Sequence, residues 1–284
     1  MNKHIVALLD GSIYSASVCE HCAWAASRLG SKLELLHVLG RREASGSGDL
    51  SGSLALGART ALLQELAALD EQRAKLINQR GRAILDDARA MLEKAGISNV
   101  ETRLRHGDLL ETVEEVQASA GLLVMGKRGE AADFATGHLG SNLERVVRIS
   151  KVPVLVASRA LQPVRRILLA FDGGEASRRA LQFLVSSPLY ADMEILVASV
   201  GGMNDATYGL LAEAQGKLEA VGRPAIGVPL VGAPEQVLPQ LVVERKIDMV
   251  VMGAYGHGRI RSMLIGSTTS EMIRTCLIPI LLLR

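Results

Sequence analysis

Short apolar runs alternate along the chain with longer segments in which apolar residues recur at helical spacing. The predicted strands, most of them such runs, lie at residues 4–10, 32–38, 100–105, 121–126 and 152–157, and again at 166–171, 193–200, 225–231, 247–252 and 279–283. Runs of this length, separated by helical patterns, predict parallel strands joined by crossover helices. The pattern therefore predicts the α/β class, with sheets buried on both faces.

The same ordered series of patterns occurs twice. HIVALLDG (4–11) corresponds to RILLAFDG (166–173), and LLVMGKRG (122–129) corresponds to MVVMGAYG (249–256). The spacing is also kept, because Asp10 precedes Val38 by the same 28 residues that separate Asp172 from Val200. An ordered series of matches indicates a tandem duplication. We therefore predict two domains, residues 1–160 (the first copy) and 161–284 (the second copy).

The copies differ in the connection after the second strand. In the first copy this connection begins with the Gly/Ser-rich segment 41–58, which predicts a flexible loop and leaves a lid over a ligand as one interpretation. A long helix near 62–95 follows, with apolar positions close to a 3.6-residue period. Its early turns place Arg73 and Arg80 among leucines. We therefore expect that part to face solvent or to pack on a partner.

Composition and charge narrow the class of protein. The 284 residues are 48% hydrophobic, which is enough for two separate cores. A net charge of +2 without charged blocks gives no signal for nucleic acid or for an anionic membrane. The first apolar run, Ile5 to Leu9, is too short for a signal peptide or a membrane span, and three cysteines do not make a disulfide framework. We expect a cytoplasmic protein.

The stretch GAYGHGRIRSMLIGST (253–268) holds the candidate chemistry. Gly253 ends the fourth strand of the second copy, and ligands of open α/β sheets bind at the carboxyl ends of the strands. Gly253 and Gly256 can adopt positive φ and expose backbone N–H groups. Gly266, Ser267 and Thr268 open a helix whose N-terminus favours phosphate. Arg259 adds positive charge between them. The stretch predicts a polyphosphate cradle without a P-loop or a Rossmann fingerprint.

The spacing Gly-x2-Gly-x9-Gly-Ser in this stretch resembles the ATP-binding motif of the universal stress protein family. Asp172 at the end of the first strand and Val200 at the end of the second complete the resemblance, which covers nearly the whole chain as two copies. It implies two five-stranded flavodoxin-like domains, of the adenine nucleotide alpha hydrolase-like type. It also implies bound ATP or AMP, with Mg²⁺ as a companion of ATP.

The resemblance also assigns roles to residues. Asp172 and the Val200 backbone would hold the adenosine, and the phosphates would lie against Gly253, Gly256, Gly266, Ser267 and Thr268. Members of the family pair through their last strands. The two copies are therefore expected to form a pseudo-dimer within one chain, and a homodimer of whole chains stays open.

The first copy departs from this motif. Ten residues instead of nine separate Gly129 from Gly140, and the loop between them carries Glu130 and Asp133. Carboxylates near a triphosphate weaken binding, although Lys127 and Arg128 just before the loop could compensate. We therefore predict a weaker second site, at Asp10, Val38, Gly126, Gly129, Gly140 and Ser141.

Several simpler interpretations compete with these sites. Asp10 and Asp172 could be helix N-caps. Cys19 and Cys22 form a CxxC pair, but they lie well inside a predicted helix and are interpreted as ordinary helix residues, without a metal.

Three functions stay open for the chain. They are a nucleotide-binding regulator in a stress response, an interaction scaffold with a degenerate pocket, and a slow ATPase. Without a Walker lysine or an acidic cluster, we predict no catalytic residue and at most weak ATP hydrolysis.

Overall fold

The computed structural model describes residues 4–40, 56–127, 141–255 and 266–284. The first copy contains β1 (His4–Leu9), α1 (Ser15–Leu29), β2 (Leu33–Leu39), α3 (Leu56–Lys94), β3 (Val100–His106), α4 (Leu109–Val116), β4 (Ala120–Gly126), α5 (Ser141–Ile149) and β5 (Val154–Ala157). The second contains β6 (Arg166–Ala170), α6 (Glu175–Ser186), a 3₁₀ turn η2 (Pro188–Tyr190), β7 (Glu194–Val200), α7 (Asp205–Glu219), β8 (Ala225–Leu230), α8 (Pro234–Glu244), β9 (Met249–Gly253), α9 (Ser267–Thr275) and β10 (Ile280–Leu283). All ten predicted strands are confirmed.

The long helix is the element whose start was predicted least well. α3 begins at Leu56, so residues 56–58, assigned above to the flexible loop, are its first residues. Leu, Ala and Arg are good helix formers, and around Gly57 they outweigh the helix cost of one glycine. The remainder of that predicted loop, 41–55, lies outside the described residues. Within the described ranges no helix, α3 included, is long and apolar enough to cross a membrane.

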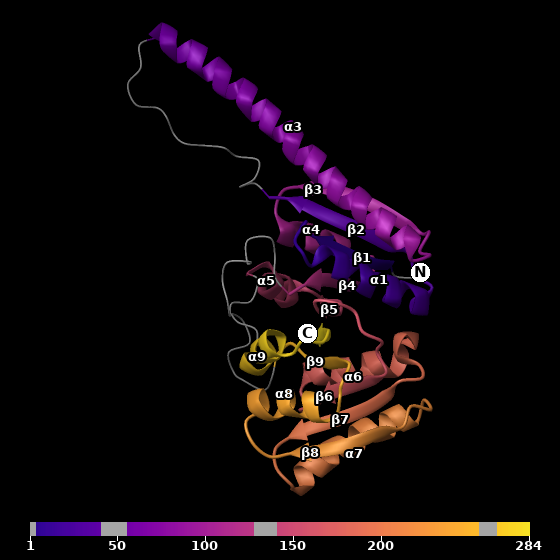
Figure 1. Ribbon diagram of the computed structural model, residues 1–284. Coiled ribbons are helices and arrows are strands. Elements are labelled where there is room, and N and C mark those ends of the chain that lie inside the picture. The colour runs from indigo at the N-terminus through magenta and orange to yellow at the C-terminus, as the bar shows by residue number, and fades with distance from the viewer. Residues whose placement is uncertain (1–3, 41–55, 128–140, 256–265) are drawn as a thin grey trace.

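The ten strands form one sheet in the order β3-β2-β1-β4-β5-β10-β9-β6-β7-β8. Every neighbouring pair is parallel except β5 and β10, which pair antiparallel with Leu155 opposite Leu281. The two copies are thus joined through their last strands, which confirms the intramolecular pseudo-dimer (Figure 1). Within each copy the order is 3-2-1-4-5, as in the first five strands of a Rossmann sheet, instead of the 2-1-3-4-5 of flavodoxin itself.

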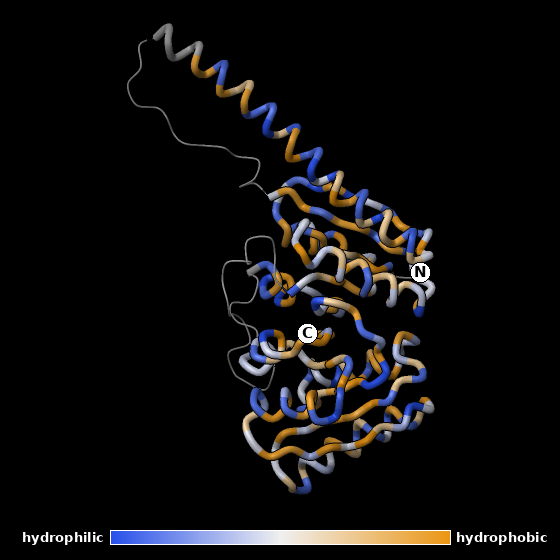
Figure 2. Tube along the Cα trace, viewed as in Figure 1, coloured by the Kyte–Doolittle hydropathy of each residue, from blue (hydrophilic) through white to orange (hydrophobic). Residues whose placement is uncertain are grey.

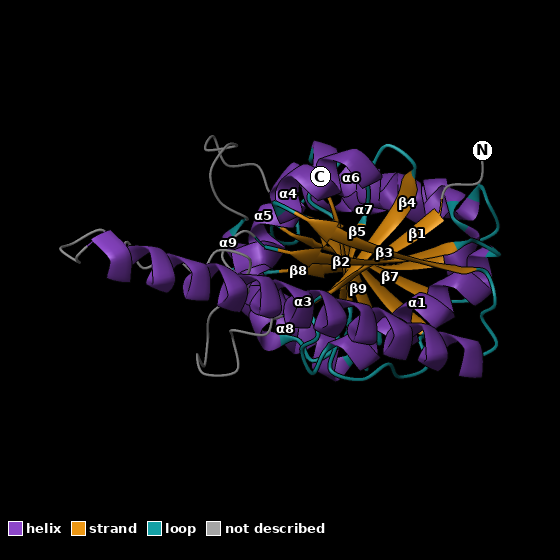
Figure 3. Ribbon diagram, turned by 90° about the horizontal axis from the view of Figure 1, so that it is seen from above, coloured by secondary structure: helices purple, strands orange, loops and turns teal. Residues whose placement is uncertain are grey.

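Helices cover both faces of this sheet (Figure 3). α1, α3, α6 and α7 pack on one face, where strand residues such as Ile5 and Ala7 are buried. α4, α5, α8 and α9 pack on the other, over the alternate residues such as Val6 and Leu8. Because both faces are covered, the inner strands are almost continuously apolar, whereas the edge strand β3 is largely polar and exposed (Figure 2). Each copy therefore presents the carboxyl ends of its strands as a polar edge between two helical layers.

Further contacts hold the two copies together. The Lys127 ammonium donates to the carbonyl of Cys276, the C-cap residue of α9. A cation favours the negative end of a helix dipole, so this contact stabilises α9 from the other copy. On the opposite face Arg28 Nε donates to the Leu189 carbonyl at 2.7 Å. The two copies therefore make one packed unit.

Candidate functional site

The predicted adenosine residues lie at one edge of the second copy. Asp172 comes two residues after β6, and Val200 is the last residue of β7. Gly253 is the last residue of β9, which pairs with β6 on its other side. Since β6, β7 and β9 are parallel neighbours, their carboxyl ends meet at the same edge. The structure thus brings together the parts that the sequence placed far apart.

The Asp172 carboxylate shapes the turn that leads into α6. Its Oδ1 accepts hydrogen bonds from Gly174 N at 2.8 Å and from Ser177 Oγ at 2.6 Å. Gly173, which lies between Asp172 and Gly174, has φ of +74°. The N-cap of α6 is Gly174, so the N-cap interpretation of Asp172 is wrong. The side chain instead closes a local turn, as short polar side chains do before helices.

Asp10 closes a similar turn in the first copy. Its Oδ1 accepts one hydrogen bond, from Ser12 N at 3.0 Å. The N-cap of α1 is Tyr14, so the N-cap interpretation is wrong here too. Both aspartates therefore hold a turn at the edge of the sheet, and Asp172 also accepts a hydrogen bond from the Ser177 side chain of the helix that follows it.

Gly253 is needed for a reason other than the one expected. It is absent from the glycines with positive φ in the described part of the chain, so the expectation of a left-handed backbone there is wrong. A Cβ at this position would lie 2.8 Å from Ala176 Cβ and 3.0 Å from Ser177 N. β9 therefore ends directly against the first turn of α6, and a glycine is required because there is no room for a side chain.

The N-terminus of α9 lies against the same strand end. Gly266 N donates to Ala254 O at 3.2 Å, and Thr269 Oγ1 donates to Gly253 O at 3.2 Å. Gly266 is the N-cap of α9, with φ of −54°, and makes no side-chain cap. Ser267 is exposed and Thr268 is half-buried. The start of α9 is thus an uncapped helix end with hydroxyl groups, which suits an anion.

These contacts form one connected network. Asp172 contacts Ser177, Ser177 packs against Gly253, and Gly253 is bonded to Thr269 on α9. Ser177 and Thr269 were not predicted from the sequence. Thr269 directly follows the Gly266–Thr268 motif and could have been found there, whereas Ser177 carries no signal without the fold. Gly256 and Arg259, also predicted as binding residues, lie outside the described residues.

The first copy holds its predicted residues in the same topological places. Asp10 follows β1, Gly126 ends β4, and Ser141 begins α5. Val38 is the residue before the last of β2, which ends at Leu39. Gly129 and Gly140 lie outside the described residues. Lys127 reaches across to α9, so the suggestion that it compensates the loop carboxylates of its own copy is not supported.

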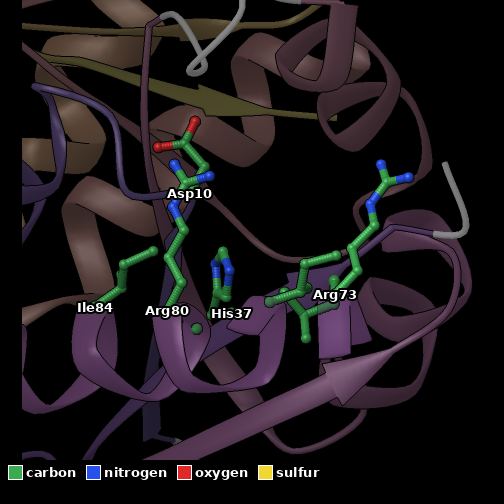
Figure 4. A pocket seen from close by; sticks show the side chains of 8 residues that line it. Asp10, His37, Arg73, Arg80 and Ile84 are labelled. Atoms are coloured by element: carbon green, nitrogen blue, oxygen red, sulfur yellow. The ribbon is translucent and has the colours of Figure 1, made fainter. Parts of the chain in front are cut away.

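A cavity of about 210 Å³ lies beside Asp10 in the first copy (Figure 4). α3 contributes Arg73, Ile77 and Arg80 to its wall. His37 forms part of the opposite wall, with its Nδ1–H donating to Leu9 O at 2.6 Å. Figure 4 shows the Arg80 guanidinium directed toward Asp10. Arg73 and Arg80 of α3 thus line the cavity beside Asp10, the aspartate that corresponds to Asp172 in the second copy.

The second copy lacks an equivalent of this helical wall. A Cβ on Gly11 would meet Ile84 of α3, and a Cβ on Gly173 would meet Leu210 of α7, so these two residues correspond. α7 begins at Asp205, five residues before Leu210, whereas α3 begins 28 residues before Ile84. The early turns of α3 therefore have no counterpart in α7. They extend past the carboxyl edge of the sheet in the first copy (Figure 1).

The CxxC pair lies inside α1. Cys19 and Cys22 are free and buried, and both pack in the core between α1 and the sheet. Burial, with a smaller contribution from Glu20, raises the pKa of the Cys19 thiol to about 11. Burial raises the pKa of Cys22 as well. Both thiols are therefore protonated near neutral pH, which makes them poor nucleophiles.

The raised pKa of Cys19 predicts a loss of stability in alkaline solution. The unfolded chain releases this proton near pH 9.0 and the folded chain near pH 11. Between these pH values the unfolded state is therefore stabilised relative to the folded state. We expect the free energy of unfolding to be unaffected by this thiol below pH 9.0 and to fall by about 2–3 kcal/mol across the interval. Urea unfolding at stepped pH measures it. The Cys19→Ala variant should show a smaller decrease, and an equal decrease would contradict the assignment.

Comparison with known proteins identifies the family. The model of the universal stress protein family matches residues 1–158 and, a second time, residues 163–284. Universal stress protein Slr1230 of Synechocystis sp. is 37% identical over 286 residues, which cover 99% of this chain and 100% of that protein. A universal stress protein of Mycolicibacterium smegmatis is 25% identical over 207 residues, 65% of this chain and 69% of that one.

The fold is also that of a solved member. The crystal structure of a universal stress protein from Archaeoglobus fulgidus matches 100% of this chain with 99% of its own, at a TM-score of 0.72 and 20% identity. The match over the full length includes both copies. Together with the double match to the family model, it shows that the chain belongs to the universal stress protein family, as a member with two such domains in tandem.

Proposed function

We propose that the second copy binds an adenine nucleotide, ATP or AMP, and that the chain is a nucleotide-responsive regulator in a stress response. The adenosine would lie between Asp172 and the backbone of Val200. The phosphates would lie against Gly253 and the start of α9, at Gly266, Ser267 and Thr268. Gly256 and Arg259 of the intervening loop would complete the phosphate site.

One observation carries this proposal, the junction of β9 with α9. Hydrogen bonds from Gly266 N and Thr269 Oγ1 fix the helix start against the strand end. Gly253 and Gly266 are therefore held close together, beside the turn held by Asp172. A helix end fixed in this way needs no rearrangement to accept an anion, which lowers the cost of binding.

The residues present fit a nucleotide phosphate. α9 begins without a side-chain cap and without an acidic residue in its first turn. Its first N–H groups and the Ser267 and Thr268 hydroxyls are donors, and phosphate oxygens are acceptors only. Bound Mg²⁺ would neutralise part of the charge of ATP, and Asp172 is the residue assigned to this site that carries a carboxylate.

The first copy supports a weaker or absent nucleotide site. The cavity beside Asp10, at about 210 Å³, is smaller than ordinary ligand pockets, which start at about 300 Å³. Arg73, Ile77 and Arg80 narrow it from α3. A ligand held at Asp10 in the manner proposed for Asp172 would have to displace them. Nucleotide is therefore proposed to bind once per chain.

A regulatory function is favoured over fast catalysis. Phosphoryl transfer needs a positioned metal and a group that orients the nucleophile. Among the residues assigned to this site, Asp172 is the acidic one, and its Oδ1 is already held by Gly174 N and Ser177 Oγ. We therefore expect ATP hydrolysis, if present, to be slower than about one turnover per second, the low end of typical enzymes.

The first test is the number of nucleotides bound per chain. The purified full chain is denatured, any released adenine nucleotide is identified and counted, and the stripped, refolded chain is titrated calorimetrically with Mg-ATP and with AMP. We expect one nucleotide per chain. Two per chain would contradict the proposed weakness of the first copy. None at millimolar nucleotide would reject the binding proposal and favour the interaction scaffold.

A further inference from the structure

The N-terminal half of α3 is a helix without a covering layer. None of the described side chains from Leu62 to Arg80 is buried, whereas Gly81, Leu85 and Leu92 in the other half are. Figure 1 shows this half projecting well beyond the sheet. Leu63, Leu69 and Leu76 expose 57%, 56% and 65% of their surfaces. Helices in globular proteins gain most of their stability from packing an apolar face, so an uncovered leucine-rich helix indicates an interaction surface.

The apolar positions follow the spacing of a coiled coil. Leu62, Leu66, Leu69, Arg73 and Leu76, which we call the α3 seam, are separated by four, three, four and three residues. This is the alternation of core positions in a heptad repeat. Arg73 takes one core position, where its apolar stem can pack while the guanidinium extends to the rim. The seam therefore suits another helix.

The charges along the same half of α3 indicate which helix would bind to the seam. Residues 62–71 carry Glu65, Asp70 and Glu71 and no basic residue, a net charge of −3. Residues 73–82 carry Arg73, Lys75, Arg80 and Arg82 and no acidic residue, a net charge of +4. A second α3 in antiparallel orientation would place the acidic segment of each helix against the basic segment of the other. A parallel helix would place like charges together, which is unfavourable.

We propose that this surface binds a second copy of the same chain, with the two α3 helices antiparallel about a twofold axis. Such an interface is self-complementary, because each contact occurs twice. In this register Leu66 faces Leu76 of the partner subunit, and Leu69 faces Arg73 of the partner subunit. The Arg73 guanidinium then lies near Asp70 of the other chain.

The short seam is sufficient because each helix is already anchored. A free coiled coil normally needs about three to four heptads, and the seam spans fewer. Leu85, Ala88 and Leu92 fix the other half of α3 to the sheet. Pairing therefore does not have to order the helix, and this reduces the cost of association. The proposal does not rest on nucleotide binding in the second copy, because the seam contains none of the residues assigned to that site; Arg73 also lines the cavity beside Asp10 in the first copy.

The oligomeric state of the full chain tests the proposal. Sedimentation velocity should give twice the mass of one 30.3 kDa chain for the wild type, and one chain mass for a Leu69→Glu, Leu76→Glu double variant. Glu is as good a helix former as Leu, so circular dichroism should be unchanged. Val243→Glu is the matched control, because Val243 on α8 exposes 77% of its surface outside the seam. This control should remain dimeric.

Disulfide trapping tests the orientation. Leu66→Cys protein is mixed with Leu76→Cys protein under mild oxidation. Antiparallel pairing predicts the mixed 66–76 disulfide as the main product, whereas parallel pairing predicts 66–66 and 76–76 products. The native cysteines are buried and should not compete. The proposal is overturned by a monomeric wild type, by a dimer that survives the double substitution, or by dominant like-with-like disulfides.

Discussion

Replacing Gly266 with valine is expected to weaken nucleotide binding by about 100-fold or more, while the chain stays folded. The effect is large because a branched side chain at the N-cap would cover the first N–H groups of α9. Hydrogen bonds to a charged ligand contribute about 1.5–3 kcal/mol each, and two of them correspond to at least two factors of ten. The fold should survive because Gly266, with φ of −54° and ψ of 144°, has backbone angles that valine also adopts. Calorimetric titration with Mg-ATP measures the loss.

The control for this experiment is the same change in the first copy. Gly140 takes the corresponding place in the motif before α5, so Gly140→Val should leave the affinity unchanged if the second copy holds the nucleotide. The reverse result, loss with Gly140→Val and none with Gly266→Val, would assign the site to the first copy. Equal and partial losses would indicate two working sites. Thermal unfolding of both variants shows whether either loss comes from misfolding.

Most of the fold could be predicted because its signals are local and repeated. Most strands are apolar runs of ordinary length, and the second occurrence of the pattern supported the first. Even the pairing of β5 with β10 was expected, although only from the family resemblance, since nothing in Leu155 or Leu281 specifies a partner. What could not be predicted is the reach of α3. Its early turns are stabilised by helix propensity, whereas the pattern of residues 41–58 indicates a loop.

The site shows the same division between local and tertiary information. The motif glycines were found from their spacing, whereas Asp172 and Val200 were expected from the family resemblance, and the described ones lie at the predicted edge. The reason for Gly253 was misjudged, because the approach of α6 to β9 is a tertiary contact between residues that are 77 positions apart, Ala176 and Gly253. Lys127 was misjudged for a similar reason. Its partner, the Cys276 carbonyl, belongs to the other copy, and only the joined sheet brings the two together.

The two copies differ in the helix that follows the second strand, near the carboxyl ends of the strands. In the second, α7 begins at Asp205 and has no counterpart of the early turns of α3. In the first, α3 carries Arg73 and Arg80 across the corresponding region. In the described part of the chain, the second copy therefore has a short helix at this position, and the first has a long helix that lines the cavity beside Asp10. The early turns of α3 form both this cavity wall and the α3 seam, so the two features have a common structural origin.

Replacing Gly253 with alanine is expected to destabilise the chain by about 1–3 kcal/mol, the usual effect of inserting a methyl group where there is no room. The added Cβ would lie 2.8 Å from Ala176 Cβ and 3.0 Å from Ser177 N, and neither atom belongs to a flexible side chain that can turn away. Backbone strain should contribute nothing, because Gly253 does not have positive φ. Urea unfolding followed by circular dichroism measures the change.

The matched control separates crowding from the general effect of a glycine-to-alanine change. Gly209 lies inside α7 of the same copy, with no atom within 4 Å of a Cβ built on it. Gly209→Ala should therefore stabilise the helix by about 0.5–1 kcal/mol, opposite in sign to Gly253→Ala. A Gly253→Ala chain as stable as the wild type would show that α6 can retreat from β9. In that case the close contact would not be what fixes this edge, and the requirement for glycine would have to come from the approach of the ligand itself.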